Sequence, residues 1–158
     1  MDIQLNPMEK ELFVLELVKA CIKRAEDSER TFGEVLGEEV FANKASAKFE
    51  KMVCSTMESL HEKGVITGTV EIGYIKEFDF EDDSERDTDE IDISICTFED
   101  IAISTEAGED VAKKGFKEAG KDFWVKVKPV IGCIGQTILQ TAVEASIKAG
   151  LNAVGITV

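Results

Sequence analysis

The chain has 158 residues, of which 44% are hydrophobic and 32% are charged, and its formal net charge is −14. This size and composition predict a folded protein with a hydrophobic core, built as one domain or as one domain with an appendage. A net charge of this sign argues against unspecific binding to nucleic acid or to anionic membranes.

The negative charge is concentrated in one part of the sequence, between Glu77 and Asp100. This window holds twelve acidic residues and a single basic residue, Arg86, so it carries −11 and leaves −3 for the rest of the chain. The acidity is therefore local, and the window needs an explanation of its own.

The cysteines, at positions 21, 54, 96 and 133, are far apart in the sequence and form no C-x-x-C pair. A zinc site is therefore not expected. Their apolar neighbours are typical of small buried hydrophobic residues, and thiols used in this way indicate a reducing compartment. The first ten residues have neither the basic nor the apolar region of a signal peptide, so we expect a cytoplasmic protein.

Two helices are predicted near the start of the chain. Asn6, Pro7 and Glu9 form a capping-box pattern with proline at the first helical position. The apolar residues that follow fall on one face of the helix: Met8, Leu12, Leu15, Val18 and Ile22. Thr31, with Glu34 three residues later, predicts a second and shorter helix that ends at about residue 42.

A third helix is predicted from Lys44 to Lys63, and Gly64 ends it by adopting a left-handed conformation. Its expected buried arc consists of Ala45, Phe49, Met52, Val53, Thr56, Met57 and Leu60. The polar face carries four residues that we take as candidate DNA contacts: Lys44, Lys48, Lys51 and Ser55. The alternative is that this face is simply solvated, because three lysines are few for a DNA-binding surface.

The pattern then changes to the alternation that is typical of strands. Residues 65–80 are predicted as one strand, 81–90 as a loop or hairpin tip, and 91–98 as the returning partner strand. Residues 101–104 are predicted as a short strand or extended segment.

The C-terminal part is predicted to be helical. Thr105 caps a helix over 106–120, and 121–128 form a helical or extended connector. Residues 129–143 contain no charge, so the helix they begin is apolar on almost every side and has to be buried. It could pack on its own domain or pair with a second copy. The run is shorter than the roughly twenty apolar residues of a membrane span.

We accordingly divide the chain into a domain over 1–120 and an apolar helical extension over 121–158. Small residues in the extension permit close approach of helices, which favours a two-fold homodimer. The expected interface residues are Ile131, Ile134, Ile138, Ala142 and Ala145.

Three helices followed by a β-hairpin is the order of a winged helix-turn-helix protein, an α+β fold. The segment "LHEKGVITG" joins the third helix to the hairpin. The later segment "IAISTEAGEDVAKKG" is similar to the I-T-x-x-G-x-x-Y-L segment that follows the wing in the YjcQ-type proteins of bacteria and their phages. Trp124, Lys126 and Lys128 loosely match a W-x-K pattern of that family.

Over roughly Glu9 to Lys128 the chain therefore resembles the YjcQ-type winged-helix proteins. It departs from their pattern in its long acidic wing and in its apolar tail. The resemblance implies a non-enzymatic binding module of the transcription-regulator type, with double-stranded DNA as its partner. In such a module the polar face of the third helix enters the major groove.

The acidic wing supports a different function. Carboxylates next to a phosphate strand weaken binding, so a DNA-binding form of this protein needs its wing to point away from the DNA. The alternative is a protein-interaction or phage-type inhibitor module, in which the wing imitates phosphate and binds a basic partner protein. The expected contacts are Asp82, Asp83, Glu85, Asp87, Asp89 and Glu90. A third interpretation is a charged loop that keeps strand edges from pairing with other chains.

The sequence offers little for catalysis. His61 is the only histidine, and no phosphate-binding loop or nucleophile elbow is present. Cys54 lies seven residues before His61, but such a pair is usually a core cysteine and a flanking histidine. Asp83, Glu85, Asp87 and Asp89 alternate as calcium ligands do, without the glycine and the glutamate that an EF-hand loop requires. We therefore expect no enzyme activity, no cofactor and no dedicated metal site.

Overall fold

The computed structural model describes residues 3–42, 46–79 and 84–158, and for 76–79 and 84–89 it describes the backbone only. The fold is α+β, as predicted. The helical elements are α1 (Pro7–Ser28), α2 (Phe32–Val35), the π-helical turn η1 (Leu36–Val40), α3 (Ala47–Glu62), the 3-10 turn η2 (Ile93–Ile95), α4 (Thr105–Ile131) and α5 (Thr137–Ala153). The strands are β1 (Ile66–Glu71), β2 (Tyr74–Asp79), β3 (Ser84–Ile91) and β4 (Thr97–Ile103).

Helix α1 starts at the predicted capping box. The Glu9 backbone N–H donates to Asn6 Oδ1 at 2.9 Å, and the Asn6 N–H donates to Glu9 Oε1 at 2.9 Å. Each of these bonds satisfies a backbone donor that the first helical turn leaves without a partner. The start of α1 is therefore determined locally by the sequence.

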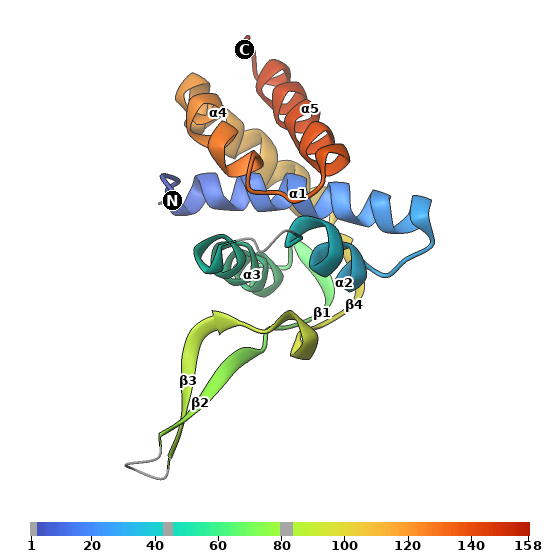
Figure 1. Ribbon diagram of the computed structural model, residues 1–158. Helices are drawn as coiled ribbons and strands as arrows, with labels where there is room; N and C mark the ends of the chain where they lie inside the picture. Colours follow the sequence, from blue (N-terminus) through green and yellow to red (C-terminus); the bar gives the residue numbers. More distant parts are fainter. Residues whose placement is uncertain (1–2, 43–45, 80–83) are drawn as a thin grey trace.

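Helix α1 lies at the centre of the molecule. Figure 1 shows it crossing the middle, with α4 and α5 on one side and α2 and α3 on the other. Every residue from Leu12 to Val18 is buried, including the charged Glu16. Leu12, Leu15 and Val18 of the predicted face are buried, and the residues between them are buried as well because helices cover α1 from two opposite sides.

The second helix also begins as predicted, at a capping box in which the Glu34 N–H donates to Thr31 Oγ1 at 3.1 Å. It changes from α-helix to a π-helical turn at Leu36. The buried carboxylate of Glu39 in that turn is ion-paired with two arginines, Arg24 at 3.0 Å and Arg30. These pairs attach η1 to the end of α1.

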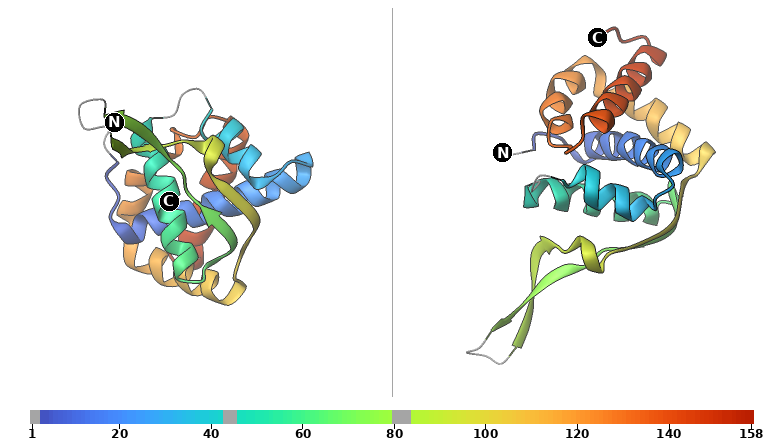
Figure 2. Two further views of the ribbon diagram at one scale, coloured as in Figure 1. Left: turned by 90° about the horizontal axis from the view of Figure 1, so that it is seen from below. Right: turned by 45° about the vertical axis from the view of Figure 1, so that its right-hand side comes forward.

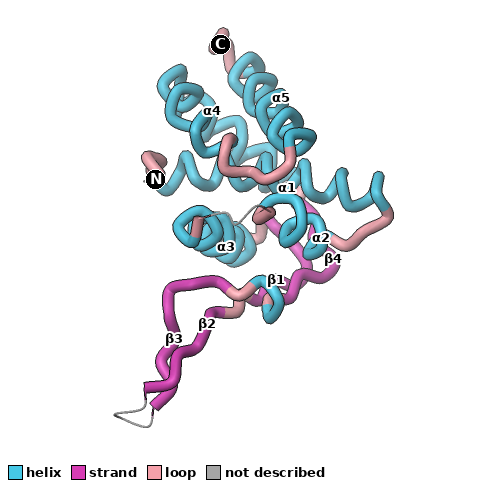
Figure 3. Tube along the Cα trace, in the orientation of Figure 1, coloured by secondary structure: helices cyan, strands magenta, loops and turns pink. Residues whose placement is uncertain are grey.

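The strands differ from the prediction in three places. The expected single strand over 65–80 is interrupted at residues 72 and 73, so β1 pairs with β4 and β2 pairs with β3, both antiparallel. Ser84 to Glu90 form most of β3, although they were predicted as loop. Ile93 to Ile95 form a 3-10 turn, although they were predicted as strand. Figure 3 shows the β2–β3 pair extending outward from the end of the β1–β4 pair.

Gly73 explains the interruption. The Asp92 N–H donates to the Gly73 carbonyl at 2.9 Å, and a Cβ at Gly73 would lie 2.7 Å from Ile95 Cδ1. The turn η2 therefore folds tightly over the junction of β1 and β2. The alternation of apolar residues does not reveal this bend, because the bend arises from contact between two segments that are distant in the sequence.

The C-terminal helices belong to the same hydrophobic core as the N-terminal ones. Helix α4 unites the predicted helix with the predicted connector and changes direction at Gly120, which has φ 67° and ψ −161°. Phe116 before this kink and Phe123 after it are both buried in the common core. Helix α5 packs on α1 and α4 through Leu139, Val143, Ile147 and Leu151. Among the helices that the structure describes, none is long and apolar enough to cross a membrane.

Candidate functional site

Helix α3 carries the candidate DNA contacts, and its ends are defined by local interactions. It starts at Ala47, three residues after the predicted Lys44, and its N-cap is Ser46, whose Oγ accepts from the Phe49 N–H at 3.1 Å. Gly64 follows its end with φ 77°, in the predicted left-handed conformation. The helix packs on α1, β1 and β3.

One side of α3 forms a basic cleft with α1. Lys48, Lys51 and Ser55 line a cleft of about 290 Å³, together with Lys10 from α1. The remaining lining residues are Ile3, Met52 and Thr56. The structure thus brings three of the four predicted contacts together, while Lys44 lies outside the described residues. Sequence reasoning missed Lys10, because the pattern of one helix does not show which face of another helix it meets.

The hydroxyl of Ser55 is already engaged within α3. It donates to the Lys51 carbonyl at 2.6 Å. Lys48 is exposed and Lys51 is half-buried. The cleft can therefore offer ammonium groups to an anion, whereas the Ser55 oxygen can only accept a hydrogen bond while this bond is intact.

An adjacent side of α3 is covered by the base of the β2–β3 hairpin. The Tyr74 hydroxyl donates to Glu58 Oε1 at 3.4 Å. Burial, and after it the negative charge of Glu90 in β3, raise the pKa of Glu50 in α3. Figure 1 and the right-hand view of Figure 2 show the hairpin running past α3 and then projecting away from the helical body.

The predicted partner-binding residues are distributed along this hairpin. Glu90, at its base, is exposed. Glu85, Asp87 and Asp89 lie in β3, where the backbone pairs Phe78 with Glu85 and Lys76 with Asp87. Asp82 and Asp83 lie outside the described residues. From Tyr74 to Ile91 the sequence holds nine acidic and two basic residues.

The predicted interface residues of the C-terminal extension separate into two groups. Ile131 and Ile134 are only 5% and 1% exposed, and both are enclosed by the core of their own chain. Ile138 is 55% exposed, and Ala142 and Ala145 are exposed as well. A second copy could therefore contact only Ile138, Ala142 and Ala145 of the predicted set without unpacking the core.

Cys54 and His61 of α3 have separate environments. Burial, chiefly, raises the pKa of the Cys54 thiol, which disfavours the nucleophilic thiolate. His61 Nε2 lies 2.7 Å from the Gly68 carbonyl oxygen and forms a hydrogen bond with it. The imidazole is thereby used to hold α3 against β1.

Comparison of the chain with protein-family models, with curated proteins and with solved structures finds no match.

Proposed function

We propose that this chain is a non-enzymatic protein-interaction module with winged-helix architecture, whose β2–β3 hairpin binds a basic surface on a partner protein. In this proposal α1, α2 and α3 are the three helices of the winged helix, and the β1–β4 pair is its sheet. The β2–β3 hairpin, inserted between those two strands, is the wing.

The observation that carries the proposal is the contact between the hairpin and α3. The base of the hairpin lies along the helix that would have to enter a DNA groove, and Glu90 is close enough to Glu50 to raise its pKa. A phosphate strand that approached α3 from this side would therefore meet a negative surface.

The strand geometry suits an imitation of phosphate. Glu85 and Asp87 occupy alternate positions in the part of β3 that pairs regularly with β2, and alternate strand positions are about 7 Å apart. This distance is about twice the 3.4 Å axial spacing of charges along one strand of double-helical DNA. A partner with a row of Lys or Arg side chains that binds phosphates is thus a suitable target.

A second candidate function is DNA binding by the cleft of Lys10, Lys48 and Lys51. The observation in its favour is that α1 and α3 bring these lysines together around one cleft. In that case phosphates approach from the α1 side of α3, and the hairpin stays off the DNA.

A charge-matched pair of variants tests the proposal. The hairpin variant combines E85Q, D87N and D89N, and the control variant combines E106Q, D110N and E118Q, which removes three exposed acids from α4. Affinity capture from a lysate of the source organism should recover a basic protein with the wild type and with the control, but not with the hairpin variant. Equal recovery by all three proteins would contradict the proposal.

A direct measurement addresses the second candidate. Fluorescence anisotropy of a labelled DNA duplex at low salt should show no binding by the wild type. If binding is seen, if it weakens with salt, and if Lys48→Glu reduces the salt slope by about one unit, the DNA function replaces the proposal.

A further inference from the structure

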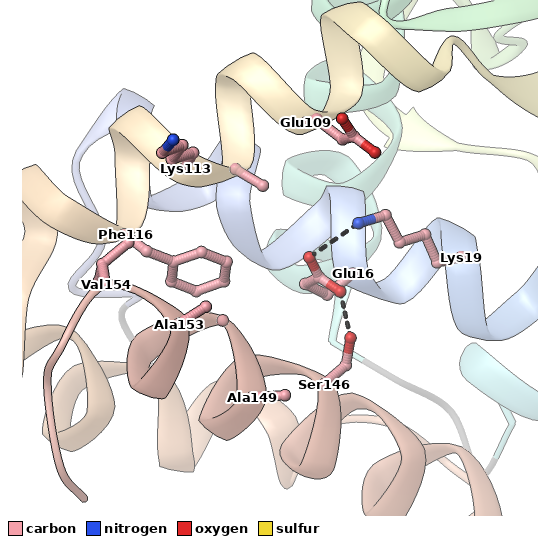
Figure 4. Close-up of a pocket in the computed structure, with 11 residues that line it drawn as sticks. Glu16, Lys19, Glu109, Lys113, Phe116, Ser146, Ala149, Ala153 and Val154 are labelled. Atoms are coloured by element: carbon pink, nitrogen blue, oxygen red, sulfur yellow. Dashed lines mark hydrogen bonds and ion pairs between the residues drawn. The ribbon is translucent and has the colours of Figure 1, made fainter.

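A separate cavity lies on the other side of α1, away from α3 and the hairpin. It occupies about 470 Å³ between α1, α4 and α5, and Figure 4 shows the side chains around it. We call it the α1–α4–α5 cavity. Its lining residues are Glu16, Lys19, Glu109, Ala112, Lys113, Phe116, Ser146, Ala149, Gly150, Ala153 and Val154.

One end of the cavity is apolar. The Phe116 ring of α4 forms its floor and is only 2% exposed, and Ala149 and Ala153 of α5 and Val154 just after that helix line its side. A Cβ at Gly150 would lie 2.6 Å from Phe116 Cζ, so α5 can approach the ring only because this residue is a glycine. Glycine at this position therefore lets α5 cover most of the ring, and the small side chains of Ala149 and Ala153 supply the open apolar surface beside it.

The other end is polar and is built around the buried carboxylate of Glu16, which is 3% exposed. Lys19 Nζ donates to Glu16 Oε1 at 3.2 Å, and the Ser146 hydroxyl donates to Glu16 Oε2. A carboxylate has about four acceptor positions, so these two donors do not exhaust it. The Lys19 side chain is 43% exposed, and its ammonium group has three hydrogens to donate.

The charges around the cavity are balanced. Glu16 and Glu109 face Lys19 and Lys113, so the lining carries no net charge. A simple cation would compete with Lys19 for Glu16, and a simple anion would be repelled by Glu16 as it approached Lys19. A ligand with both charges can bind the carboxylate and the ammonium group together.

We propose that the α1–α4–α5 cavity binds a small zwitterion with an apolar side chain, of the class of free α-amino acids. The ligand's ammonium group donates to Glu16, and its carboxylate accepts from Lys19. Its side chain lies against Ala149, Ala153 and Val154, above the edge of Phe116. The volume is within the usual range for small-molecule sites, about 300–1,000 Å³.

The first test compares three ligands of similar size on the full-length wild-type protein by isothermal titration calorimetry. They are L-phenylalanine, phenethylamine, which lacks the carboxylate, and 3-phenylpropanoate, which lacks the ammonium group. L-Phenylalanine is expected to bind, and each of the other two to bind at least about tenfold more weakly. No binding of L-phenylalanine up to about 10 mM, or equal binding of either analogue, overturns the proposal.

The second test determines whether the ligand binds in the cavity. Ala149→Leu fills the space beside Phe116, whereas Ala145→Leu makes the same change on α5 outside the lining. The first change should weaken L-phenylalanine binding at least about tenfold, and the second should leave it unchanged. Equal affinity in both variants contradicts the assignment. If Ala149→Leu does not fold, Ala153→Leu takes its place, and the comparison of ligands on the wild type stands without either variant.

Discussion

Two isoleucines on opposite faces of α5 provide a direct test of how the C-terminal helix packs. Ile147 is fully buried against the core, and Ile138 is 55% exposed. Replacing each by alanine removes the same three carbon atoms from the same helix. At about 0.8 kcal/mol for each buried carbon, Ile147→Ala loses about 2.4 kcal/mol from transfer alone. The cavity it leaves brings the expected loss to about 2–5 kcal/mol.

Ile138→Ala should cost far less. About half of the Ile138 side chain is already exposed to water. Alanine also has the higher helix propensity, by about 0.4 kcal/mol. We therefore expect its free energy of unfolding to remain within about 1 kcal/mol of the wild type. The two variants should differ by at least about 1–2 kcal/mol.

Urea unfolding, followed by circular dichroism and by the fluorescence of Trp124, measures both losses. Trp124 is a suitable reporter because it lies between Lys128 and Lys148, whose ammonium groups are 5.6 and 5.1 Å from its ring centre. Each protein is measured at a low and at a high concentration. Equal losses in the two variants, together with a midpoint that rises with concentration, would refute this reasoning and indicate a second copy covering Ile138, Ala142 and Ala145.

Two further predictions concern titratable groups. Because the folded state raises the pKa of Glu50, it disfavours the charged form, and Glu50→Gln should stabilise the protein by about 0.5 kcal/mol at neutral pH. This gain in stability is complete above the folded pKa and vanishes below the ordinary pKa of glutamate. The urea midpoints of the wild type and Glu50→Gln should therefore differ at neutral pH and converge as the pH is lowered. Glu62→Gln serves as the exposed control. Cys21 is buried, and burial raises its pKa to about 12. When the protein is treated with iodoacetamide, mass spectrometry should therefore detect labelling of the half-buried Cys96 and Cys133 first. Early labelling of Cys21 would contradict its burial.

The sequence predicted the features that depend on neighbouring residues. The capping boxes of Asn6 and Thr31 are present because each needs only a side chain and a backbone N–H three residues away. Gly64 ends α3 with the expected positive φ for the same reason. Such interactions are complete within one turn of the chain, so the pattern contains all the information they require.

The features that were missed depend on contacts between distant segments. Acidic residues are poor strand formers, so Ser84–Glu90 gave no strand pattern, although pairing with β2 holds them in one. Lys10 joins the cleft of Lys48 only through the packing of α1 on α3. The apolar segment around Ile138 has two apolar faces, and the sequence could not show which of them meets α1 and α4.

The central position of α1 has a consequence for synthesis on the ribosome. The helix emerges early, but α5, which covers one of its apolar sides, is translated more than 100 residues later. At about 10 residues per second, this side of α1 remains exposed for on the order of 10 s before α5 is synthesised. During that time the apolar residues on that side of α1 are exposed to other nascent chains and to chaperones. A chain interrupted before α5 is a target for quality control, because it keeps that surface exposed permanently.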